Sequence, residues 1–136
     1  MASIHREVVI EASAAHAWSA LEDMGALHTR LVPGFVVDTK LEYGPLARIV
    51  TFGNGLVARE RIVDCDAQAR RLVWSAESDR LTHHNASAQV FDEGPSHCRF
   101  VWIADLLPHE AAPAIAAMIE SGLATIKTTL ERSARG

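Results

Sequence analysis

The sequence lacks the features that mark membrane-spanning, exported and disulfide-stabilised proteins. No apolar run reaches the length of about 18 residues that a membrane-spanning helix requires, and the first residues contain no apolar signal-peptide core. The two cysteines, Cys65 and Cys98, lie in strand-like segments without the C-x-x-C spacing of metal or redox sites. We therefore expect a cytoplasmic protein with two buried thiols.

Motifs for common cofactor chemistry are also missing. The net charge of −4 and the absence of a Lys/Arg cluster argue against a nucleic-acid partner. The seven histidines show no H-E-x-x-H or other ligand spacing, no G-x-G-x-x-G opens a helix, and no G-x-S-x-G supplies a nucleophile. We expect no bound metal, no cofactor and no nucleic acid.

The longest regular pattern that is present lies between Pro108 and Arg132. Its apolar residues recur at helical spacing and predict a helix from about residue 110–112 onward, because Pro113 fits only the first turn. The apolar stripe consists of Ile115, Ile119, Gly122, Ile126 and Leu130, widened by Met118 and Leu123. Gly122 leaves two interpretations open: close packing of the helix on a sheet, or free space for a ligand.

The rest of the chain is mostly strand-like. A strand at 3–11 precedes two short helices, at 14–22 with Ser13 as N-cap and at 24–31. Six segments of alternating polarity follow, at 35–41, 46–52, 56–65, 71–77, 82–92 and 97–107. Short turns between them imply antiparallel neighbours. With 136 residues, we predict a single domain over 1–136 of the α+β class, in which a seven-stranded antiparallel sheet curls around the long C-terminal helix.

This order of elements resembles the START-related, or SRPBCC, superfamily with its helix-grip fold. Local motifs match bacterial members of the superfamily: residues 13–23, Arg48 followed by Gly55 and 59–62, residues 64–66 with 70–74, and Val101-Trp102 before Pro108. The superfamily includes pollen-allergen-like proteins, lipid-transfer domains and polyketide cyclase/dehydrase-like proteins. The resemblance implies a cavity between the concave face of the sheet and the long helix.

Side-chain alternation predicts which residues line this cavity. We expect Leu27, Leu31, Val32 and Phe35 to form an apolar gate at one end. The apolar walls are predicted to be Trp74, Phe100 and Trp102 from the sheet, with Ile115, Met118, Ile119, Gly122, Leu123 and Ile126 from the helix.

Two polar clusters are predicted near the cavity. If Arg59 and Arg61 face outward, Glu60 faces inward and needs a partner, for which Arg48 on the neighbouring strand is the candidate. The pair is either a structural ion pair or a ligand anchor with an acid/base role.

The second polar cluster is the adjacent pair His83 and His84, of which only one can face the cavity. An inward His84 is followed by a small apolar face, whereas an inward His83 brings polar residues with it. Since imidazole suits proton transfer near neutral pH, His84, His83 and Glu60 are the candidate catalytic residues.

These patterns support three functional hypotheses. The first is a protein that binds a hydrophobic small molecule, such as a lipid, a polyketide or an aromatic compound, with Arg48, Glu60 and one histidine orienting its polar end. The second is a polyketide cyclase/dehydrase-like enzyme that uses the same residues. The third is an interaction module without a ligand, in which the cavity is collapsed or the gate face binds a partner. An exposed sheet edge or the outer face of the sheet also permits a homodimer.

Overall fold

The computed structural model describes residues 2–136, apart from the side chain of Pro45. Its strands are β1 (Ala2–Ile10), β2 (Val36–Glu42), β3 (Ala47–Phe52), β4 (Val57–Asp66), β5 (Arg71–Glu77), β6 (His83–Asp92) and β7 (Cys98–Leu107). Its helices are α1 (Ala14–Leu21) and α2 (Ala112–Ala134), and three short turns of helix are η1 (Leu27–Leu31), η2 (Gly44–Leu46) and η3 (His109–Ala111).

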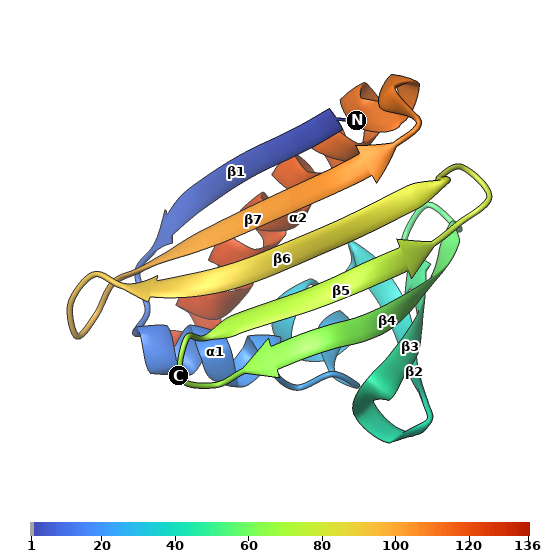
Figure 1. The fold of residues 1–136 in the computed structure, drawn as a ribbon. Coiled ribbons are helices and arrows are strands. Elements are labelled where there is room, and N and C mark those ends of the chain that lie inside the picture. The colour runs from blue at the N-terminus through green and yellow to red at the C-terminus, as the bar shows by residue number, and fades with distance from the viewer. Residues whose placement is uncertain (1) are drawn as a thin grey trace.

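The seven strands form one antiparallel sheet in the order β1-β7-β6-β5-β4-β3-β2. The sheet curls, and α2 runs diagonally behind β1, β7 and β6 (Figure 1). Helix α1 lies near the end of α2, where His16 Nε2 is 2.7 Å from Ser133 Oγ. The predicted α+β helix-grip architecture is confirmed.

The two segments after β1 differ in how fully they form helix. Ser13 has extended backbone angles and its side chain accepts a hydrogen bond from the His16 N–H, so the predicted N-cap of α1 is confirmed. The predicted second helix is reduced to the single π-helical turn η1. The backbone of Ala26 lies outside the helical region, and Val32, which precedes a proline, does so as well.

Helix α2 buries the predicted stripe against the sheet. Its buried residues are Ile119, Gly122, Leu123, Ile126 and Leu130. A Cβ at Gly122 would lie 2.9 Å from Trp102 Cζ3 and 3.4 Å from Phe35 Cε2. The two aromatic rings therefore occupy the space that the missing side chain leaves, and close packing is the correct interpretation of Gly122.

One burial prediction is wrong. Cys98 is fully buried, but Cys65 is exposed. A β-bulge between Ile62 and Asp64 shifts the register of β4, and every residue from Val63 to Asp66 is exposed. The last part of β4 lies outside the core, so alternation of polarity there does not report burial.

Hydrogen bonds connect the C-terminal part of α2 to the C-terminal end of β1. Lys127 Nζ donates a hydrogen bond to the Val9 carbonyl at 2.8 Å and to Glu131 Oε2 at 2.6 Å. The same Glu131 oxygen accepts the backbone N–H of Glu11 at 2.9 Å. These hydrogen bonds, first the one from Glu11 and then the one from Lys127, lower the pKa of the Glu131 carboxyl.

We predict that Glu131→Gln costs about 0.5–1 kcal/mol of folding free energy at neutral pH, because it removes the charge from these hydrogen bonds. The folded-state pKa is lowered, so this stabilisation is complete above the ordinary value of 4.5 and is lost as the pH falls below it. Urea unfolding at several pH values measures the difference. Glu120→Gln, on an exposed part of the same helix, is the control. A difference between wild type and Glu131→Gln that does not shrink in acid would contradict the assignment.

Candidate functional site

A cavity of about 1190 Å³ lies between the concave face of the sheet and α2. Its mouth is formed by connections around Gly34, Asn54, Arg80 and Glu110. In an antiparallel sheet of this order, four segments lie at the same end of the strands (Figure 1): the connections β3–β4, β5–β6 and β7–α2, and the start of β2. The cavity therefore opens at one end of the sheet. Two of its charged lining residues, Arg80 and Glu110, lie on the connections that form this mouth.

The cavity wall is mainly apolar. Trp74 and Trp102 are in edge contact, with ring centroids 6.0 Å apart, and Phe35 and Phe52 are in a similar contact at 5.7 Å. The predicted lining residues that do line the cavity are Trp74, Phe100, Trp102, Ile115, Met118, Ile119 and Ile126, with the gate residues Leu27, Leu31, Val32 and Phe35.

Two predicted wall residues do not reach the cavity. Gly122 and Leu123 are buried in the contact between α2 and the sheet and do not line the cavity. Sequence reasoning also missed Phe52, Leu56 and Leu81, which lie in or beside turns and line the mouth. Their apolar character next to turn residues was the available signal, but the mouth forms only when distant connections meet.

The predicted pair Arg48 and Glu60 faces inward and is almost fully buried. Arg48 Nε donates to Glu60 Oε1 at 2.8 Å, and Arg48 Nη1 donates to the Met24 carbonyl at 3.3 Å. The side chains lie on directly paired residues of β3 and β4, and the two residues are 3% and 7% exposed. Both line the cavity. An ion pair in an apolar wall needs such close geometry, since desolvation of either charge alone is costly.

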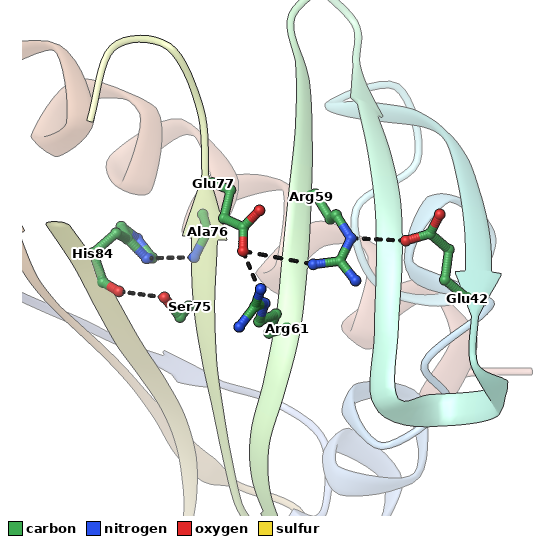
Figure 2. Close-up of polar contacts among 7 residues, drawn as sticks. All are labelled: Glu42, Arg59, Arg61, Ser75, Ala76, Glu77 and His84. Atoms are coloured by element: carbon green, nitrogen blue, oxygen red, sulfur yellow. Dashed lines mark hydrogen bonds and ion pairs between the residues drawn. The ribbon is translucent and has the colours of Figure 1, made fainter. Parts of the chain in front are cut away.

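The register of β6 places His84 toward the cavity and His83 in solvent. His84 is half-buried and lines the cavity, whereas His83 is exposed and does not. His84 Nδ1 accepts the backbone N–H of Ala76 at 3.0 Å, and the Ser75 hydroxyl donates to the His84 carbonyl at 2.6 Å (Figure 2). Burial lowers the pKa of His84, an effect that the charge of Glu60 only partly opposes.

Outward-facing residues of β2, β4 and β5 form a separate ion-pair network. Arg59 lies between Glu42 and Glu77, at 2.8 and 3.5 Å, and Arg61 lies 2.8 Å from Glu77 (Figure 2). These contacts confirm that Arg59 and Arg61 face away from the cavity. The alternation along β4 therefore separates solvent-side charges from the one carboxylate that lies inside.

Within residues 2–136, no group of three or more His, Cys, Asp or Glu side chains is placed to hold a metal ion. None of the helices described is long and apolar enough to cross a membrane. Away from the mouth, the titratable residues of the cavity wall are Arg48, Glu60 and His84.

The family model described as polyketide cyclase / dehydrase and lipid transport matches residues 1–131. The chain belongs to this family, and the resemblance to the SRPBCC superfamily is confirmed. No curated protein matches the chain. The family description names both enzymatic activities and the transport of lipids.

Solved structures share the fold over nearly the whole chain. An uncharacterized protein from Bacillus thuringiensis has 18% identity and a TM-score of 0.86, covering 95% of this chain and 98% of that chain. Norcoclaurine synthase from Thalictrum flavum has 18% identity and a TM-score of 0.75, covering 97% and 95%. A START superfamily protein from Mycobacterium smegmatis has 14% identity and a TM-score of 0.72, covering 98% and 97%. At these identities the likeness shows the fold alone.

We predict that Arg48→Met and Glu60→Leu each destabilise the protein by about 3–5 kcal/mol, because each leaves a buried charge without its partner. The double variant is expected to recover most of this loss, since it removes both charges from the apolar wall. Guanidinium unfolding of the two single variants and the double variant measures the coupling.

Arg61→Met is the control for this cycle, because Arg61 lies on the outer face of the same strand and is exposed. We expect it to cost far less than either buried substitution. Strictly additive losses of stability in the double variant would show that Arg48 and Glu60 are solvated independently. This result would contradict an ion pair between them.

Proposed function

We propose that the protein binds a hydrophobic small molecule, of the lipid, polyketide or aromatic kind, in the cavity between the sheet and α2. The observation that carries this proposal is a large open cavity in which aromatic and aliphatic side chains surround a single buried ion pair and one histidine. Burial of apolar ligand surface supplies the affinity, at roughly 25 cal/mol per Å² of area removed from water.

The charges in the wall support an uncharged ligand. Arg48 and Glu60 neutralise one another, and burial disfavours the charged form of His84. A ligand with a charged group would have to leave it at the mouth, near Arg80 or Glu110. The open cavity also weighs against an interaction module with a collapsed interior.

A polyketide cyclase/dehydrase-like enzyme is the second candidate, because the family description names this activity and His84 and Glu60 both line the cavity. The buried ion pair limits Glu60 as a base, and exposure removes His83 from the cavity wall. His84 is the remaining imidazole that could touch a substrate.

Native mass spectrometry of the purified protein and titration with N-phenyl-1-naphthylamine, an uncharged fluorescent probe, test the binding function. We expect either a co-purified apolar molecule or saturable probe binding at a stoichiometry of about one, as one cavity of this kind implies. Absence of both would contradict the proposed function.

A matched pair of substitutions on α2 locates the binding site. Ala117 and Ala124 are both exposed, but only Ala117 lines the cavity. Ala117→Trp is expected to lower probe affinity by roughly tenfold or more by filling the cavity, about the effect of a 1.4 kcal/mol loss, whereas Ala124→Trp leaves it unchanged. Equal effects of the two substitutions would place the probe elsewhere.

A further inference from the structure

A transverse row of polar groups crosses the inner face of four adjacent strands. Arg48 pairs with Glu60 across β3 and β4, and Glu60 pairs with Ala76 across β4 and β5. Ala76 in turn donates its backbone N–H to the side chain of His84 on β6. The row places the imidazole two strands from Glu60 along the same wall of the cavity.

The contact with Ala76 fixes which nitrogen of His84 carries the proton. A backbone N–H can only donate, so Nδ1 must present its lone pair, and the neutral ring then carries its proton on Nε2. The hydrogen bond from the Ser75 hydroxyl to the His84 carbonyl, at 2.6 Å, holds the backbone of the same residue (Figure 2). Among residues 2–136, no protein group accepts a hydrogen bond from Nε2.

The geometry points to His84 as a fixed hydrogen-bond donor that selects, among apolar molecules of one shape, those with an acceptor oxygen such as a carbonyl. This inference rests on the proposed function, because it concerns the ligand of the same cavity. His84 lines the cavity, and the two charged residues of the wall that lie away from the mouth, Arg48 and Glu60, already bind one another. The polar end of the ligand is therefore an uncharged oxygen that accepts the Nε2–H.

Fluorenone and fluorene test this selectivity, because they share a rigid tricyclic shape and differ in a carbonyl against a methylene group. Their affinities are measured by displacement of N-phenyl-1-naphthylamine from the wild type and from His84→Phe, which keeps an aromatic ring of similar size without a donor. We expect the fluorenone-to-fluorene affinity ratio to fall roughly three- to tenfold in the variant, the value of one hydrogen bond.

Carbazole, which presents an N–H at the same place, supplies the opposite case. The affinity of carbazole relative to fluorene is expected to be no lower in His84→Phe than in the wild type, because Nε2–H cannot accept a hydrogen bond from the carbazole N–H. A carbazole preference that depends on His84 would show that Nε2 is an acceptor, and would overturn the inference.

A second measurement needs no variant and guards against misfolding of His84→Phe. Nitrogen-15 NMR of the wild-type imidazole is expected to show the Nε2–H tautomer, with an Nε2 shift that changes on addition of fluorenone and not of fluorene. An Nδ1–H tautomer, or an equal response to both compounds, would overturn the inference.

The two proposals fail in different ways. If no apolar molecule co-purifies and neither the probe nor any of the three tricyclic compounds binds, the proposed function fails. If all bind, and the fluorenone-to-fluorene ratio is the same in the wild type and His84→Phe, the cavity binds apolar molecules but His84 does not select them.

Discussion

The close contact between α2 and the concave face of the sheet, at Gly122, is the constraint on which the rest of the structure depends. Trp102 and Phe35 lie in the space where a side chain would stand, so the helix rests on aromatic rings. Because these same rings line the cavity, the contact that holds the helix also builds part of the cavity wall. The helix lies close to the sheet at this position, while further along the sheet a large space remains open between the two.

The buried ion pair is better explained by the cavity than by stability. A pair such as Arg48 and Glu60 gains little over well-packed apolar residues, because two desolvation costs offset the attraction. Its position, however, adds a neutral polar patch to a wall that is otherwise mainly apolar. Such a patch contributes little to affinity but orients a ligand and discriminates against those that leave it unpaired.

Much of the fold could be predicted from the sequence because its patterns are local. The period of two along β4 placed Arg59, Glu60 and Arg61 on their correct faces, and proline and glycine marked most strand ends. The exposure of Cys65 has no local signature, because Cys65 pairs with the fully buried Leu72 and yet lies at the end of β4, outside the core. Likewise, alternation could not choose between His83 and His84, because a shift of one residue reverses every face of a strand.

The same limit applies to the chemistry of the cavity. A sequence can nominate a histidine as a base, but its tautomer is set by the backbone group that it meets. A general base must accept a proton at the atom that faces its substrate. In His84 that atom already carries the proton, while Nδ1 is occupied by the Ala76 N–H. If a reaction occurs in this cavity, His84 is therefore suited to stabilise negative charge that develops on a substrate oxygen, and not to remove a proton from carbon.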